Sequence, residues 1–356
     1  MAAEQARPTQ SGRRPHVRRV LVAAFAAAAA LAAGVIFVAR ALAGPPVIHA
    51  GPFPFALAMT PNGSTLYVAD GAPYGQSSCS GGRDTVVPVS TVTRTAGKAI
   101  RIGGRPAQMV MAPDGRTLYI LTCTGNVIPV NVATRTPGAP IPVHAGPVGP
   151  GGLAITPNGR TLFVAGHSLI PISTATGRLG TPIPVTGAPG AMVVSPDGRT
   201  LYVAGFSDTG TADVITPVDL ASGKRGITIH LSSSVYALAL APDGRTLFVS
   251  DDNGVVPVDT ATGRLGSPID TGYHTPDALA VSSDGRTMYA AMPDDGTVLP
   301  ISLTTDKLGN AIHVAPRFFT AYPTALIVAP GDRTLYVIDG NHGNGAVAII
   351  SLTVAR

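Results

Sequence analysis

The stretch that decides the fold is Pro113-Asp114-Gly115-Arg116-Thr117-Leu118-Tyr119-Ile120, because closely similar phrases occur seven times along the chain. Asp or Asn followed by Gly indicates a tight β-turn, in which glycine takes the left-handed conformation. A short apolar run precedes each phrase and an alternating run follows it, so each copy predicts a β-hairpin. The other copies are Pro61–Val68, Pro157–Val164, Pro196–Val203, Pro242–Val249, Ser283–Ala290 and Pro330–Val337, the last two being degenerate.

A second hairpin follows in each copy. Its first strand has the form Val86-Val87-Pro88-Val89, a turn such as Thr174–Arg178 comes next, and a fourth strand such as Pro182–Val185 completes the unit. The copies recur about every 45 residues and fill Gly44–Arg356, which leaves no second domain. Four strands at this period make one propeller blade. The sequence therefore predicts an all-β protein, a seven-bladed β-propeller over residues 44–356.

The two ends of the array complete each other. The seventh copy ends after its third strand, Ala346–Leu352, while Pro45–His49 precedes the first copy and has the pattern of an orphan fourth strand. Pairing these two segments would close the ring and remove two exposed sheet edges. We therefore expect the N-terminal strand to close the propeller.

Proline recurs in the third strand of six copies, where it removes a hydrogen-bond donor from the ladder. We expect these prolines to mark a loosely paired outer part of each blade. They are Pro88, Pro129, Pro171, Pro217, Pro257 and Pro300.

The N-terminal region predicts export to or through a membrane. Residues 1–19 form a basic leader, and Val20–Ala39 is a run of 20 residues without a charge or proline, long enough to span a bilayer. The arginines before it keep the leader cytoplasmic by the positive-inside rule. A cleaved signal ending at Ala41-Leu42-Ala43 is the alternative. Either interpretation places residues 44–356 on the extracellular or periplasmic side.

The Leu-Tyr-Val-Ala phrases, such as Leu66–Ala69 and Leu201–Ala204 after their Gly-containing turns, resemble the YVTN-repeat family of seven-bladed propellers, which includes lactonase-like members. The resemblance covers nearly all of residues 44–356 and implies the fold rather than an activity. The aromatic residue of each phrase is expected to pack between blades. These residues are Tyr67, Tyr119, Phe163, Tyr202, Phe248, Tyr289 and Tyr336.

Composition narrows the function classes. The chain has 42 Gly, 33 Pro and no Trp, and no glutamate follows Glu4, which disfavours surface helices beyond the N-terminus. From Gly44 onward nineteen Lys and Arg balance nineteen Asp. A neutral domain argues against nucleic-acid binding, which requires a basic patch. We expect a monomer that binds a protein, polymer or small-molecule ligand.

Variable loops on a repeated scaffold are the natural place for binding. The connections between second and third strands, and those between blades, carry carboxylates and histidines that could bind a cation or act as acid and base. Polar turns and isolated histidines are the competing interpretation. The candidate residues are His167, Asp251, Asp252, His274, Asp277, Asp294, Asp295, Asp339 and His342.

The channel mouth argues against catalysis. The residues that open the innermost strands are Phe55, Ala107, Gly151, Gly190, Tyr236, Asp277 and Thr324. A metal-dependent propeller hydrolase needs several carboxylates or histidines there, and Asp277 stands alone. We therefore expect an interaction module that acts through its variable loops, with no metal and no cofactor. A lactonase-like hydrolase that uses Asp and His groups on the same face is the alternative.

The two cysteines predict a disulfide. Cys79 lies in the insertion between the second and third strands of blade one, and Cys123 lies in the equivalent connection of blade two. Adjacent blades place these connections on one face, and an oxidising compartment favours their pairing.

Overall fold

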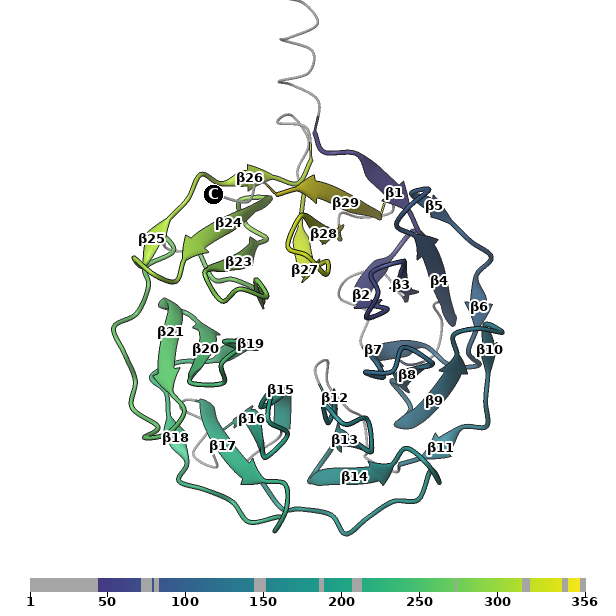
Figure 1. Cartoon of the computed structure of the whole chain (residues 1–356), viewed down its shortest axis with the longest axis horizontal. Helices are drawn as coiled ribbons and strands as arrows, with labels where there is room; N and C mark the ends of the chain where they lie inside the picture. Colours follow the sequence, from purple (N-terminus) through teal and green to yellow (C-terminus); the bar gives the residue numbers. More distant parts are fainter. Residues whose placement is uncertain are drawn as a thin grey trace, which may run out of the picture. The chain divides into compact units, whose positions relative to one another are not determined.

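A computed structural model describes residues 44–71, 79, 83–143, 152–185, 189–206, 213–272, 274–315, 321–340 and 345–352. These residues form seven antiparallel sheets arranged in a ring (Figure 1). No helix within the described ranges is long and apolar enough to cross a membrane. The leader, Val20–Ala39 and the possible cleavage site at Ala43 lie outside those ranges, so their predicted roles stay predictions.

Each sheet is one blade, with the first strand of the unit innermost. Blades one to three are β2 (Pro54–Met59), β3 (Thr65–Asp70), β4 (Thr85–Ser90), β5 (Thr95–Ala96) and β6 (Ile100–Arg101); β7 (Pro106–Met111), β8 (Thr117–Thr122), β9 (Asn126–Asn131), β10 (Thr136–Pro137) and β11 (Ile141–Pro142); β12 (Leu153–Ile155), β13 (Thr161–Ala165) and β14 (Leu169–Ser173).

The remaining blades follow the same order around the ring. They are β15 (Pro189–Val194), β16 (Thr200–Phe206), β17 (Asp213–Asp219) and β18 (Ile229–His230); β19 (Val235–Leu240), β20 (Thr246–Asp251) and β21 (Gly254–Asp259); β22 (Ala278–Val281), β23 (Thr287–Met292), β24 (Thr297–Ser302), β25 (Lys307–Leu308) and β26 (Ile312–His313); β27 (Pro323–Val328), β28 (Thr334–Asp339), β29 (Ala346–Ser351) and β1 (Val47–His49).

The hydrophobic core is divided into seven clusters, one between each pair of neighbouring blades. The repeated aromatic residue of each second strand belongs to the cluster shared with the following or preceding blade. Tyr67 of blade one packs with Met109 and Ile120 of blade two, and Tyr336 of blade seven packs with Val68 of blade one. The predicted role of these aromatics in blade packing is therefore confirmed.

The N-terminal strand closes the ring. β1 pairs with β29 in antiparallel register, with Val47 opposite Ala348 and His49 opposite Ala346. Ile48 is buried in the cluster between blades seven and one. Blade seven is thus built from both ends of the described chain, as the orphan strand predicts.

The sheet accommodates the third-strand prolines because the outer strand is interrupted opposite them. Pro88 accepts a hydrogen bond from the Gly97 N–H at 2.7 Å. A residue in an antiparallel strand directs its N–H and C=O to the same side, so the missing donor of Pro88 also faces outward. There the chain leaves the ladder between β5 and β6. The equivalent bonds, each 2.7 Å, join Gly138 to Pro129, Gly180 to Pro171, Gly226 to Pro217, Gly266 to Pro257 and Gly309 to Pro300.

Outer pairing is weakest in blades three and five, where the fourth strand is reduced to isolated bridges. The predicted strand Pro182–Val185 contributes one bridge, Leu169 to Ile183. Two prolines in four residues remove the donors that a longer ladder needs. Blade seven differs, because Ile349 occupies the proline position and its N–H donates to the Pro46 carbonyl at 2.8 Å.

The hairpin turns also contact one another around the ring. In a typical contact, a Cβ on Gly115 would come within 3.0 Å of the Pro61 ring of the preceding blade. Gly115 has a φ of 69°, so both conformation and packing favour glycine. The same contact joins the turns of most neighbouring blades. The further pairs are Pro330 with Gly63, Pro113 with Gly159, Pro157 with Gly198, Pro196 with Gly244, and Pro242 with Gly285.

The two degenerate copies complement each other at the one junction without this contact. Ser283 replaces the proline in blade six, and Asp332 replaces the glycine in blade seven. The Ser283 N–H donates to both Asp332 carboxylate oxygens, at 2.9 and 3.0 Å, and the Ser283 hydroxyl donates to Oδ2. A hydrogen-bonded pair thus takes the place of the proline–glycine contact.

This exchange predicts coupled substitutions. Ser283→Pro removes both donors to Asp332 and should destabilise the protein, whereas Ser283→Pro with Asp332→Gly recreates the contact of the other blades. We expect a coupling free energy of about 1–2 kcal/mol in a double-mutant cycle measured by urea unfolding. Additive effects of the two substitutions would contradict this account of the junction.

Candidate functional site

Each blade directs both of its hairpin turns to the same side. The Val132 N–H of the β9–β10 turn donates to the Arg116 carbonyl of the β7–β8 turn at 2.9 Å, and Thr174 bonds Arg160 in the same way at 3.0 Å. We call the surface formed by these turns the turn face. The opposite surface, formed by the connections between second and third strands and between blades, is the loop face.

The described part of the loop face is strongly acidic. Its cationic side chains are Arg83, Arg101 and Arg105, and Arg83 lies 3.6 Å from the carboxylate of Asp70. The described ranges place ten aspartates there. They are Asp70, Asp84, Asp213, Asp251, Asp252, Asp270, Asp277, Asp294, Asp295 and Asp339.

A β-bulge at the start of the innermost strand forms the channel mouth. In blade five Val235 pairs with Asp251 and Ala237 with Ser250, so Tyr236 is the extra residue and is 46% exposed. Asp277 holds the equivalent place in blade six, directly before β22. Bulges redirect side chains away from the ladder. Phe55, Ala107 and Thr324 are the extra residues of blades one, two and seven, and Gly190 lies in the irregular segment of blade four.

Tyr236 binds one carboxylate of the mouth and lies near two others. Its hydroxyl donates to Asp252 Oδ1 at 2.9 Å. That hydrogen bond raises the pKa of Tyr236, and burial and the charges of Asp252, Asp277 and Asp213 raise it further. The phenol therefore stays a neutral donor at physiological pH. The sequence did not predict the hydrogen bond between Tyr236 and Asp252. It did place Tyr236 and Asp277 at the same position of the repeat.

Asp213 is buried beside Tyr236. Its Oδ2 accepts a hydrogen bond from the Val235 N–H at 2.7 Å, which ties blade four to blade five. Its Oδ1 is buried and has no hydrogen-bond partner among the described residues. Burying a polar oxygen without a hydrogen bond is unfavourable.

His274 brings two further carboxylates together. Its Nδ1 lies 3.7 Å from Asp294 Oδ2, and its Nε2 lies 3.4 Å from Asp295 Oδ1. Burial raises the pKa of Asp277, and the charge of Asp294 raises it further. Blades five and six therefore share an acidic cluster, composed of Tyr236, Asp252, His274, Asp277, Asp294 and Asp295.

The structure gives other predicted site residues a structural role. Asp251 is 1% exposed and accepts bonds from Ser233 Oγ at 3.0 Å and the Asn253 N–H at 2.8 Å. Asp339 accepts the Tyr322 N–H at 2.9 Å. Both carboxylates hold the chain where it enters an innermost strand, so polar turn formation accounts for them.

The predicted histidines are not brought together. His167 is exposed in the β13–β14 connection of blade three, whereas His274 lies in the approach to blade six. His342 lies outside the described residues. Within the described ranges, no three His, Cys, Asp or Glu side chains are close enough to hold a metal ion.

The structure joins Cys79 and Cys123 by a disulfide, with 5.7 Å between their Cα atoms. The bond links the blade-one insertion to the β8–β9 connection of blade two. It constrains the loop face away from the acidic cluster.

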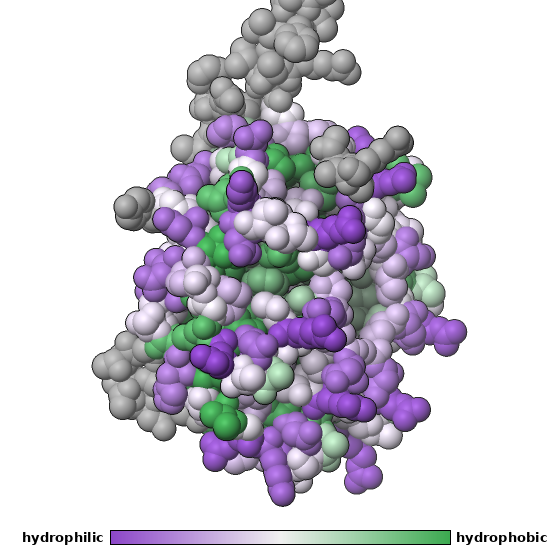
Figure 2. Space-filling view, turned by 60° about the vertical axis from the view of Figure 1, so that its left-hand side comes forward, coloured by the Kyte–Doolittle hydropathy of each residue, from purple (hydrophilic) through white to green (hydrophobic). Residues whose placement is uncertain are grey.

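Polar side chains dominate the surface between the loops and turns. Figure 2 shows hydrophilic residues around interrupted strips of apolar residues rather than one broad apolar area. The visible surface therefore offers no single broad apolar area for docking.

Comparison with solved structures supports the architecture. The chain is a seven-bladed β-propeller. It superposes on a hydrazine synthase chain of Kuenenia stuttgartiensis with a TM-score of 0.72 and 21% identity, covering 85% of this chain and 97% of that one. The Cps50 (Swd1) propeller domain of Myceliophteria thermophila gives 0.70 and 14%, covering 86% and 99%. No family model matches the sequence, and no curated protein matches it. At this identity the likeness concerns the fold.

The acidic cluster predicts a pH-dependent stability effect at Asp277. The folded-state pKa of Asp277 is raised, so the folded protein favours the neutral carboxylic acid over the carboxylate. The stability contributed by the neutral form is present at acidic pH and is lost as pH rises through the folded-state pKa. Asp277→Asn should therefore raise the melting temperature at neutral pH and lose that gain at acidic pH, where both side chains are neutral. Asp306→Asn on the turn face is the control, and an equal response from it would contradict the assignment.

Proposed function

We propose that the protein is a non-catalytic interaction module of the extracytoplasmic space, attached to the membrane by Val20–Ala39, which binds a cationic partner through its loop face. The acidic cluster of blades five and six carries this proposal. It combines exposed carboxylates with a phenol fixed at the channel mouth.

The composition of the cluster favours binding over chemistry. Both ring nitrogens of His274 face carboxylates, and the Tyr236 hydroxyl already donates to Asp252. A hydrolase of the lactonase type would need a metal or an activated nucleophile near these groups. Opposed carboxylates and an aromatic ring instead suit Lys or Arg side chains, through ion pairs and cation–π contacts.

Two further features belong to the proposal. The likeness of the Leu-Tyr-Val-Ala phrases to YVTN-repeat propellers supports a role in surface or extracytoplasmic recognition. The disulfide between Cys79 and Cys123 supports the same location, because such bonds persist in oxidising compartments.

The test uses a fluorescent oligolysine peptide as the probe and anisotropy as the measurement. Asp252→Asn with Asp277→Asn should weaken binding about tenfold, because close charge pairs at an interface contribute strongly. Asp114→Asn with Asp243→Asn removes the same charge from the turn face and should leave affinity nearly unchanged. Equal losses in the two double variants would contradict loop-face binding.

A second measurement separates binding from catalysis. The protein is incubated with a panel of lactones, with and without divalent cations, and product formation is followed. We expect no turnover above the uncatalysed rate. Cation-dependent turnover that disappears in Asp277→Asn and His274→Gln variants would replace the proposal with the lactonase-like alternative.

A further inference from the structure

The equal numbers of cationic and anionic residues in the propeller conceal a separation of charge between its faces. The turns carry thirteen exposed Lys and Arg side chains but eight Asp, whereas the described loop face carries ten Asp. The turn-face cations are Arg94, Arg116, Arg135, Arg160, Arg178, Arg199, Lys224, Arg225, Arg245, Arg264, Arg286, Lys307 and Arg333.

The aspartates of the turn face are occupied by the turns themselves. Asp197 accepts the Arg199 N–H at 3.0 Å and the Ser195 hydroxyl at 2.5 Å, and Asp259 accepts the N–H and hydroxyl of Thr262 at 2.7 and 2.6 Å. These hydrogen bonds lower the pKa of both carboxyl groups. Among the described turn-face residues, one ion pair within 4.0 Å is formed, between Arg199 and Asp197 at 3.9 Å. The guanidinium groups therefore extend into solvent from turns whose carboxylates are held close to the backbone.

Two of these arginines occupy strained backbone positions. Arg94 and Arg135 have φ values of 56° and 57° at the place where three other blades have glycine. A left-handed conformation is unfavourable for a long side chain, and Asp306 of blade six shares it with a φ of 54°. Both lie where the turn of one blade meets the preceding blade.

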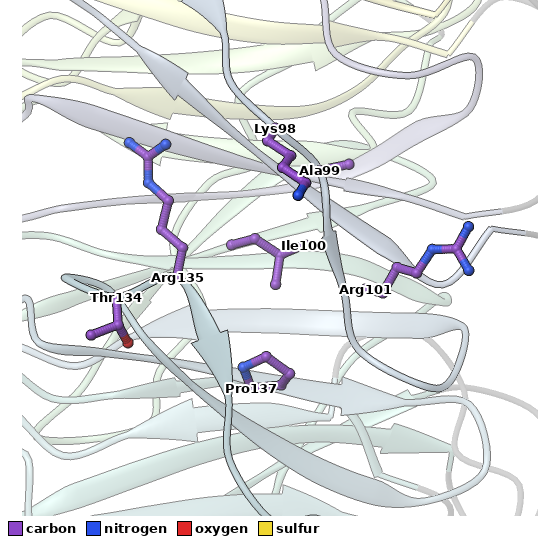
Figure 3. A pocket seen from close by; sticks show the side chains of 7 residues that line it. All are labelled: Lys98, Ala99, Ile100, Arg101, Thr134, Arg135 and Pro137. Carbon is purple, nitrogen blue, oxygen red and sulfur yellow. The ribbon is translucent and has the colours of Figure 1, made fainter.

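Arg135 helps to form a cationic groove at the rim of blades one and two. A cavity of about 660 Å³ lies between β5–β6 of blade one and the β9–β10 turn of blade two. Arg135 lies on one side and Lys98 on the other, with Ile100 and Pro137 between the two segments, whereas the Arg101 guanidinium points away from them (Figure 3). No acidic side chain lines the groove, so it suits a phosphate-sized anion with an adjoining apolar part.

The chain reaches the propeller at the same face. Val47 pairs with Ala348, and Pro46 accepts the Ile349 N–H, towards the end of β29 that adjoins the turn of Arg333. Pro46 therefore lies towards the turn-face end of blade seven. Only six residues separate Ala39 from Pro46, and six residues span at most about 22 Å.

We infer that the turn face is a docking surface for a bilayer that contains anionic phospholipids, with Lys98 and Arg135 at the rim groove binding a lipid headgroup. The proposed membrane anchor would hold the propeller near a bilayer. The charge argument stands without the anchor. Each Lys or Arg near an anionic surface adds about fivefold to membrane affinity.

Residues 44–356 provide the test, because they contain all seven sheets and all seven core clusters and lack the apolar segment. Sedimentation with vesicles of phosphatidylcholine alone is compared with vesicles containing about 30% phosphatidylglycerol, an anionic lipid. We expect binding to the anionic vesicles, little binding to the neutral ones, and a steep loss between about 0.1 and 0.5 M salt.

Two matched triple variants localise the surface. Arg160→Gln, Arg199→Gln and Arg245→Gln remove three charges from the turn face and should lower vesicle affinity at least about tenfold. Thr124→Asp, His167→Asp and Asn253→Asp change the net charge equally on the loop face and should retain most of it. Thermal unfolding confirms that both variants are folded.

A groove variant tests the headgroup site. Lys98→Gln with Arg135→Gly should weaken vesicle binding further, and glycine also relieves the left-handed position. Equal binding to neutral and anionic vesicles, or equal loss in the two triple variants, would overturn the inference. Soluble polyphosphate or duplex DNA that binds the turn face while vesicles do not would overturn its assignment to lipid. Oligolysine binding by the loop face is measured separately, so the two proposals fail independently.

Discussion

The pairing of β1 with β29 is the interaction on which the rest of the structure depends. Seven sheets in a ring leave one place where the chain must meet itself, and an unpaired third strand there would expose an edge. The ladder from Val47 to His49 removes that edge. It also completes the core cluster between blades seven and one.

Repetition turns a local turn sequence into a property of a whole face. In a tight turn such as Asp243-Gly244-Arg245, the carboxylate accepts the arginine N–H and the guanidinium extends outward. Every blade repeats the same strand order (Figure 1), so these turns lie together on one side of the ring. The loops gather on the other side and follow no shared motif, which allows an acidic cluster to form around Tyr236. A domain with no net charge thus has two surfaces of opposite sign.

Much of the fold could be predicted, because the repeat specifies hairpins through contacts between near neighbours in sequence. The closing strand was also recognisable, since each end lacks what the other supplies. The Ser283–Asp332 hydrogen bond could not be predicted, because it joins residues that lie 49 positions apart. Taken singly, each of these residues is only a departure from the repeated sequence. The sequence predicted loose outer pairing but not its cause. The hydrogen bond from the Gly97 N–H to the Pro88 carbonyl shows that the missing proline donor faces the outer edge of the blade.

The members of the acidic cluster were visible in the sequence, but their contacts were not. The aligned channel-mouth positions named Asp277 as a candidate, and they also contained Tyr236. The net charge of the domain, however, does not show which face of the ring carries each charged residue. Counting charges therefore could not reveal the basic turn face. Contacts such as the one between His274 and Asp295 depend on how two blades are placed, which no local pattern encodes. The most direct test of the account is the unfolding free energy of Ile349→Pro measured beside Pro300→Ile. Ile349→Pro removes the donor to Pro46 and should cost at least about 1 kcal/mol, whereas Pro300→Ile should change stability by less than about 1 kcal/mol. Equal, small effects in both variants would contradict closure of the ring by the N-terminal strand.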